Sequence, residues 1–324
     1  MEFVTLEEIR AARARIENAA LYTPMLEVPS PQAGSASSGT EAPSLFLKCE
    51  NLQPMGAFKI RGAFNMISQL PADALKRGVV TYSSGNHGQA VALAAKTLGA
   101  PAVIVMPTTA PAVKIEGCKG YGAEVIMEGT TSLHRQARAE KEASERGLTI
   151  VPPFDHEQII IGQGTTGLEI LEQCPDAGTV FVPAGGGGLV SGVAAAIKLS
   201  NPSVRVVAVE PAGAPKVSRS LEAGHPVTLE SSASIADGLM NLRPGAITFA
   251  HIQKYVDEVV TVSEAEIASA VAWLFKHARI VAEPSGAITT AAVSLGLGHP
   301  TGKVVAIVTG GNVAPEKFAQ YIGV

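Results

Sequence analysis

From residue 79 onward the sequence repeats one pattern: a short, mostly apolar run, then a turn rich in glycine or polar residues, then a stretch with helical spacing. The apolar runs do not alternate with polar residues, which is typical of parallel strands covered on both faces. Strands that alternate with helices in this way indicate βαβ units. We therefore predict an α/β fold with parallel-rich sheets and helices on both faces. The strands expected on this ground are 79–82, 102–106, 125–127, 149–151, 180–182, 204–209, 259–262 and 304–308.

The composition favours a folded protein that works on small molecules. The chain has 324 residues, of which 46% are hydrophobic and 17% are charged, so it can bury a large core. Its formal net charge of -4 leaves no basic surplus to neutralise phosphates. We therefore expect no nucleic-acid partner.

The sequence also indicates the cellular compartment in which the protein works. The sequence has no stretch of 18 apolar residues, and its acidic, amphipathic start, MEFVTLEEIR, is unlike a signal peptide. The three cysteines, Cys49, Cys118 and Cys174, are too few and too widely spaced for a disulfide framework or a zinc site. We therefore expect a cytoplasmic protein with no membrane partner.

Four consecutive glycines, Gly185, Gly186, Gly187 and Gly188, stand between an expected strand and an expected helix. Glycines let the backbone approach a ligand closely, and the amino end of the following helix offers free N–H groups and a partial positive charge. We interpret the run as a phosphate cradle rather than a flexible turn. It does not match the G-x-x-x-x-G-K-[ST] pattern of P-loop NTPases. NAD binding is disfavoured too, because it prefers an acidic residue about twenty residues later at a strand end, and Glu210 at the end of the next strand is only the closest candidate.

A second cluster, Ser83-Ser84-Gly85-Asn86-His87-Gly88, also follows an expected strand and opens a helix. Its N–H groups could hold a carboxylate by the same dipole argument. A simple capping turn would need one Ser or Asn, whereas this turn carries four polar side chains.

The third cluster is GAFKIRGA, with Lys59 between Phe58 and Ile60. Desolvation there would lower the pKa of the Lys59 amine and make it a nucleophile toward carbonyls. The alternative is an ordinary solvated surface lysine. A fourth cluster, Thr309-Gly310-Gly311-Asn312, closes the last expected strand and could be a simple turn.

Together these motifs resemble the fold-type II pyridoxal-phosphate (PLP) enzymes, and among them the threonine/serine dehydratases and serine racemase. GAFKIRGA, SSGNHGQA, VPPFDH followed by GQGT, GGGG and TGGN occur in the family's order, from YTP at Tyr22 to Asn312. The resemblance implies a two-domain fold similar to the tryptophan synthase β subunit, with the cofactor between the domains. Residues 1–76 and 157–324 would form the large PLP-binding domain and 77–156 a small inserted domain. With 12 residues after Asn312, we expect no C-terminal regulatory domain.

The resemblance also implies roles for individual residues. Lys59 would link covalently to pyridoxal 5'-phosphate and later remove the Cα proton of the substrate, and Ser84 could act as acid or base on the opposite face. The other cofactor-binding residues would be Phe58, Asn86, Gly185 to Gly188, Glu283 and Thr309. The substrate carboxylate would be framed by Ser83, Ser84, Asn86 and His87. Thr309 would face the pyridine nitrogen, where a hydroxyl makes a weaker electron sink than a carboxylate and suits prompt loss of a β-leaving group.

The chain departs from the family pattern at two places. Ala57 replaces a serine two residues before the reactive lysine. Relatives bind a divalent cation through positions that match Glu210 and Ala214, but the third ligand position here is Lys216. An ammonium there would repel Mg²⁺ or Ca²⁺, so we predict no divalent cation at Glu210 and Ala214.

The function implied is that of a PLP-dependent ammonia-lyase (dehydratase), acting as a homodimer. It would convert the small-molecule substrate L-threonine, L-serine or a related 3-hydroxy amino acid to a 2-oxo acid and ammonia. Phe154 in VPPFDH resembles threonine dehydratases more than animal serine racemases, which carry a polar residue there. The alternatives are a serine racemase and a non-catalytic protein that binds a phosphate or nucleotide ligand. The motifs leave the preferred 3-hydroxy amino acid open, because side-chain pockets come from loops far apart in sequence.

Overall fold

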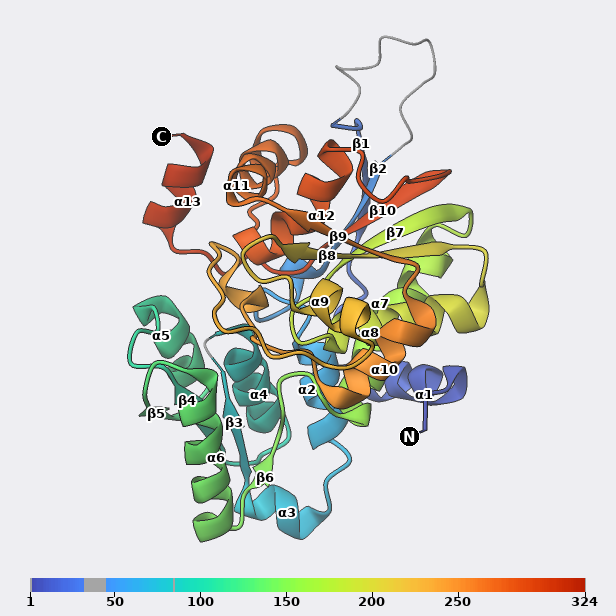
Figure 1. The fold of residues 1–324 in the computed structure, drawn as a ribbon. Helices are drawn as coiled ribbons and strands as arrows, with labels where there is room; N and C mark the ends of the chain where they lie inside the picture. The colour runs from blue at the N-terminus through green and yellow to red at the C-terminus, as the bar shows by residue number, and fades with distance from the viewer. Residues whose placement is uncertain (1, 32–44, 84, 324) are drawn as a thin grey trace, which may run out of the picture.

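The computed structural model describes residues 2–31, 45–83 and 85–323, and in them the chain forms two separate β-sheets with helices around each (Figure 1). The expectation of an α/β fold with parallel-rich sheets covered on both faces is confirmed. Among the described residues, no helix has both the length and the apolar character that a membrane span requires.

The larger sheet has six strands, and all but one of its pairings are parallel. The exception is the edge strand β1, which runs antiparallel to β2 with Met25 opposite Lys48. In sheet order the strands are β1 (Met25–Val28), β2 (Leu45–Cys49), β10 (Lys303–Val308), β7 (Ala177–Pro183), β8 (Arg205–Pro211) and β9 (Glu258–Val262).

The smaller sheet is entirely parallel, in the order β5 (Glu124–Met127), β4 (Ala102–Met106), β3 (Val79–Tyr82) and β6 (Thr149–Ile150). One face packs against α4 (Asn86–Thr97), α5 (Ala112–Gly120) and α2 (Ile60–Ile67) in one apolar cluster. The other face packs against α6 (Ser132–Arg146), whose Ala139 meets Val80, Val103 and Val105.

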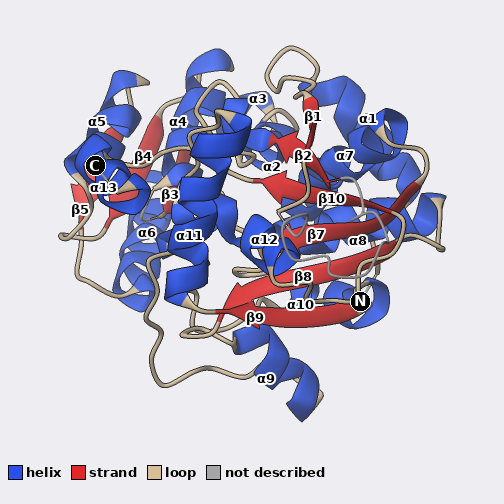
Figure 2. Cartoon of the chain, turned by 90° about the horizontal axis from the view of Figure 1, so that it is seen from above, coloured by secondary structure: helices blue, strands red, loops and turns tan. Residues whose placement is uncertain are grey.

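Helices also cover both faces of the larger sheet, as the view from above shows (Figure 2). One face packs against α1 (Leu6–Ile16), α7 (Glu157–Gln173), α8 (Gly188–Ser200) and α10 (Ala246–Tyr255). The opposite face packs against α11 (Glu264–Trp273) and α12 (Pro284–Ser294). The remaining elements are α3 (Ala72–Arg77), α9 (Lys216–Ala223), α13 (Pro315–Ile322), the 3₁₀ turns η1 (Glu50–Leu52) and η2 (Asp237–Leu239), and the π-helical turn η3 (Leu274–Ala278).

This topology brings the sequence motifs to one region. The turn 83–88 follows β3, the glycine loop 185–188 follows β7, the turn 309–312 follows β10, and the segment 50–59 follows β2. Each motif therefore lies at the carboxyl end of a parallel strand, where open α/β sheets bind their ligands.

Candidate active site

Lys59 lies directly before α2, at the end of the segment that leaves β2. Its Nζ donates a hydrogen bond of 2.8 Å to the carbonyl oxygen of Pro153, and it lies 5.1 Å from the centre of the Phe58 ring. Burial lowers the pKa of Lys59 to about 8. The neutral, nucleophilic fraction of this amine near neutral pH is therefore much larger than that of an ordinary lysine.

The Lys59 segment is fixed to the turn that follows β10. The amide of Phe58 donates to the carbonyl oxygen of Thr309 at 3.1 Å, and Ala57 forms a β-bridge with Gly310. Gly56 has a φ of +79°, and a Cβ added there would lie within 3.0 Å of Asn312. A glycine is thus required for the close approach of the two segments.

The turn 83–88 lies beside Lys59. The Ser83 hydroxyl accepts a hydrogen bond from the amide of Gly85 at 3.1 Å, and the Nε2 of His87 lies 3.1 Å from the carbonyl oxygen of Val151. Burial lowers the pKa of His87 to about 3, and the charge of Lys59 adds to this shift. His87 is therefore a neutral group at physiological pH. Ser84 lies outside the described residues.

Asn86 connects this turn to the larger sheet. Its Nδ2 donates to Glu283 Oε1, and its Oδ1 accepts from Asn312 Nδ2 at 2.9 Å. Burial raises the pKa of Glu283 to about 7, and its Oε2 has no hydrogen-bond partner among the described residues. The hydroxyl of Thr309 donates to the carbonyl oxygen of Ser285 at 3.2 Å. The predicted positions Asn86, Glu283 and Thr309 thus come from three elements to one place.

The glycine loop meets the Lys59 region through Phe154. A Cβ added to Gly186 would lie 2.3 Å from the Phe154 ring, and one added to Gly188 would lie 3.1 Å from the Cα of the same residue. Gly187 has a φ of +102°, which favours glycine. Because Pro153 accepts the Lys59 hydrogen bond and Phe154 packs on the glycine loop, the two predicted cofactor-binding segments are neighbours.

Asp155 holds this connection, and the sequence reading did not single it out. Its carboxylate accepts hydrogen bonds from the first amides of α10, those of Ala246, Ile247 and Thr248, at 2.9, 2.9 and 3.1 Å. A negative charge at a helix amino end is stabilising. Asp155 thereby fixes the segment that carries Phe154. The only available signal was its place within VPPFDH.

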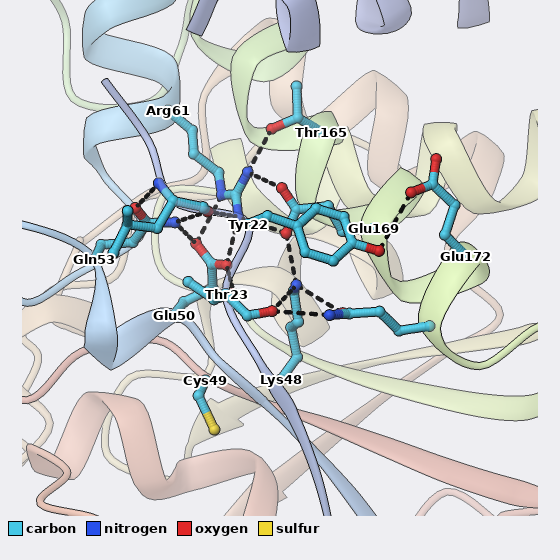
Figure 3. Close-up of polar contacts among 12 residues, drawn as sticks. Tyr22, Thr23, Lys48, Cys49, Glu50, Gln53, Arg61, Thr165, Glu169 and Glu172 are labelled. Atoms are coloured by element: carbon cyan, nitrogen blue, oxygen red, sulfur yellow. Dashed lines mark hydrogen bonds and ion pairs between the residues drawn. The ribbon is translucent and has the colours of Figure 1, made fainter. Parts of the chain in front are cut away.

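A buried ion network lies at the start of α2, next to Lys59 in sequence (Figure 3). Arg61 forms paired hydrogen bonds to Glu50 and Glu169, and Lys48 donates to Glu169 at 2.6 Å. Two buried cations are thus matched by two buried carboxylates, which fixes α2 against α7 and β2. Sequence reasoning missed this network, although charged residues inside apolar runs were a signal.

The Lys216 ammonium lies beside Glu210 and Ala214, the two residues that match the cation ligands of relatives. Lys216 Nζ donates to the carbonyl oxygen of Ala214 at 3.1 Å and lies 3.5 Å from Glu210 Oε2. The Glu210 carboxylate also accepts from the amides of Val217 and Ser218 at the start of α9. In the described part of the chain, no cluster of three or more His, Cys, Asp or Glu side chains could hold a metal ion.

Comparisons with known proteins agree with this arrangement. The family model described as "Pyridoxal-phosphate dependent enzyme" matches residues 16–310. An L-threonine ammonia-lyase from Thermotoga maritima is 43% identical over 96% of this chain and 76% of its own length. A serine racemase from Oryza sativa subsp. indica is 42% identical over 95% of this chain and 91% of its own length. Among solved structures, maize serine racemase superposes with a TM-score of 0.93 at 40% identity, covering 99% of this chain and 98% of that one.

Proposed function

This chain belongs to the pyridoxal-phosphate dependent enzyme family, and from that premise we propose that it is an ammonia-lyase acting on L-threonine, L-serine or a related 3-hydroxy amino acid. The products are a 2-oxo acid and ammonia. Supporting the proposal is the chemistry that the site offers: one amine with a lowered pKa, an anion cradle and a polar turn that can hold a carboxylate.

The residues present fit pyridoxal phosphate. Added Cβ atoms would clash at Gly186 and Gly187, so the loop is shaped for close approach, and the amino end of α8 supplies N–H groups for a phosphate. Glu283 has a buried oxygen next to Asn86 that finds no partner within the described ranges, which suits a ligand with polar ring atoms. When bound, the cofactor withdraws electrons from the substrate Cα and so acidifies its proton.

We assign the proton transfer at Cα to Lys59. Its pKa of about 8 lets the amine exist in the neutral form that accepts a proton. The carbonyl oxygen of Pro153 orients the Nζ through its 2.8 Å hydrogen bond. The ring of Phe58 lies beside this amine, within the buried surroundings that lower its pKa.

The turn 83–88 is assigned to the substrate carboxylate. The first amides of α4, next to Ser83, Asn86 and His87, supply donors and a positive dipole end. His87 is neutral, and because its Nε2 donates to the carbonyl oxygen of Val151, its Nδ1 is left as a hydrogen-bond acceptor. Ser84 is assigned to the same carboxylate from its place in the motif alone. Thr309 and Glu283 are assigned to the polar side of the cofactor ring.

The observation that carries the proposal is the lowered pKa of Lys59 next to the glycine loop. The test incubates the purified, cofactor-loaded enzyme with L-threonine and L-serine and measures 2-oxo acid and ammonia. A yellow protein that is fixed at Lys59 by borohydride and releases both products supports the proposal. A yellow protein that releases neither product from any 3-hydroxy amino acid would refute it.

A second candidate is serine racemase, and the likeness to the rice enzyme over 91% of its length favours it. Racemisation needs a second acid or base opposite Lys59, and Ser84 is the proposed group. The same incubation decides between the two, since D-serine and pyruvate can be measured in one sample.

We also propose how the chain is organised. The four-stranded sheet takes all its strands from 79–150, which supports a small inserted domain at 77–156 and a large domain at 1–76 and 157–324.

The assembly that we propose is a homodimer. The half-exposed apolar side chains of Leu21, Tyr22 and Leu52 support it, and light scattering would test it.

A cytoplasmic location is proposed on separate grounds. All three cysteines are free and buried, as suits a reducing compartment.

A further inference from the structure

An ion pair joins the two sheet units next to the proposed active site. Lys114 on α5 donates to the carboxylate of Asp237 in η2. The Lys114 side chain is 6% exposed, whereas that of Asp237 is 38% exposed. A buried cation from one unit is therefore matched by a carboxylate from the other that still reaches solvent.

The pair lies between the two loops that define the site. A Cβ added to Gly85 would lie 3.0 Å from Lys114 Nζ, so the ammonium borders the turn 83–88. A Cβ added to Gly185 would lie 3.1 Å from the carbonyl oxygen of Gly238, the residue after Asp237. A substrate held between the turn and the glycine loop therefore lies close to both charges.

The cation is already fully matched by nearby carboxyl groups. Although burial alone would lower it, the pKa of Lys114 lies above its usual value because Asp237 and Glu283 are close. Burial raises the pKa of Glu283 to about 7, and Lys114 and Asp237 act on it in opposite directions. The summed charge of Lys114, Asp237 and Glu283 therefore goes from neutral to negative as Glu283 ionises. The three groups together offer no net positive charge to a ligand.

We propose that the Lys114–Asp237 pair sets the substrate class, admitting amino acids with a neutral group on Cβ and rejecting those with a carboxylate there. This inference rests on the proposed function. A second carboxylate on the substrate would meet the negative charge of Asp237 in a site of low dielectric constant, where repulsion is strong. A hydroxyl, methyl or amide group meets no such penalty.

The test compares two ligands of the same shape and different charge. L-Aspartate and L-asparagine are titrated into the cofactor-loaded enzyme, and binding is followed by the absorbance of the bound cofactor. We expect wild type to bind L-asparagine at least about tenfold more tightly. Asp237→Asn keeps the shape and the hydrogen-bond acceptor but releases the charge of Lys114, so this preference should shrink by about tenfold or reverse.

Three further variants control the comparison. Asp257→Asn removes one partner of another Lys–Asp pair, with Lys198, at the amino end of β9 and so away from the site. It should leave the preference unchanged. Lys114→Met combined with Asp237→Asn should abolish the gain in L-aspartate binding, because the freed cation is gone. Asp237→Ala repeats the test if the asparagine variant does not fold.

Two outcomes would overturn the inference: wild type that binds both ligands equally, or an unchanged preference in the Asp237 variants. A gain that survives in the double variant would also overturn it, since Lys114 would then not be the group that accepts the carboxylate. In a parallel assay, Asp237→Asn should raise the ratio of turnover on L-threo-3-hydroxyaspartate to turnover on L-threonine. Failure of wild type to deaminate L-threonine and L-serine refutes the proposed function instead, and the binding comparison still decides this inference.

Discussion

The ammonium nitrogen of Lys216 lies 2.7 Å from the carbonyl oxygen of Ala184, the residue that precedes the glycine loop. The same nitrogen donates to the carbonyl oxygen of Leu239, at the end of η2, at 3.0 Å. Both Lys216 and Glu210 are fully buried. Burial lowers the pKa of Lys216 to about 8, so it remains largely protonated at pH 7. One tethered cation thus joins the glycine loop to the turn that carries Asp237.

We predict that Lys216→Met lowers the free energy of unfolding by about 3 kcal/mol, because Glu210 and the carbonyl oxygens lose their buried cation. Cofactor affinity should fall as well, since the glycine loop loses its anchor at Ala184. Urea unfolding and cofactor titration measure the two effects. Lys141→Met, at a lysine whose side chain is 62% exposed, is the matched control and should change neither quantity.

The variant Lys216→Asp should turn this position into a divalent-cation site. It adds a carboxylate to Glu210 and to the carbonyl oxygens of Ala184, Ala214 and Leu239, and oxygen ligands of this kind suit Mg²⁺ or Ca²⁺. Its melting temperature should rise with added Ca²⁺ and fall with EDTA. Wild type should respond to neither. A wild-type enzyme inactivated by EDTA and restored by Mg²⁺ would contradict the role given to Lys216.

Lys59→Ala should remain folded and lose turnover by at least about a thousandfold, because the enzyme-bound amine acts at a high effective concentration.

The cofactor-free wild type should load with cofactor faster as the pH rises, and the rate should level off above about pH 8, because only the neutral amine of Lys59 is nucleophilic. At pH 7 about 10% of such an amine is neutral, against about 0.03% at the ordinary lysine pKa. Stopped-flow absorbance measures the rate. A loading rate that still climbs between pH 9 and 10 would show an unshifted lysine.

The motifs that follow strands could be predicted, because a glycine or polar turn at the carboxyl end of a parallel strand has few other uses. The turn 83–88, the glycine loop and the turn 309–312 were placed in this way, whereas Lys59 was singled out by its apolar neighbours; the structure brings all four together. Their chemical roles stay predictions.

Contacts that depend on tertiary packing could not be predicted. The strands β1 and β2 were missed, since Lys48 within LFLKC breaks the apolar pattern and is buried only because Glu169 on α7 pairs with it. Asp155 and Asp237 act through partners at 246–248 and at Lys114, which lie far from them in sequence. No local pattern specifies such pairs.

The packing of Phe154 on Gly186 gives a test of the glycine loop. Gly186→Ala should lower cofactor affinity by at least about tenfold, because the new Cβ would lie 2.3 Å from the Phe154 ring and must displace the loop or the ring. The double variant Gly186→Ala/Phe154→Ala removes the clash and should recover part of the affinity. Cofactor dissociation constants from fluorescence titration decide. An undiminished affinity in the single variant would show that this loop does not hold the phosphate.

The last prediction concerns elimination against racemisation. Racemisation needs a second proton donor opposite Lys59. His87 cannot supply it, since burial lowers its pKa to about 3 and its Nε2 is engaged with the carbonyl oxygen of Val151. That leaves Ser84, a weak acid, whereas loss of the β-hydroxyl needs only Lys59 and an acid near the departing group. We therefore expect L-serine to give pyruvate faster than D-serine. Ser84→Ala should erase any D-serine and spare dehydration. Chiral chromatography of the incubation measures both products, and D-serine accumulating faster than pyruvate would assign the chain to the racemases.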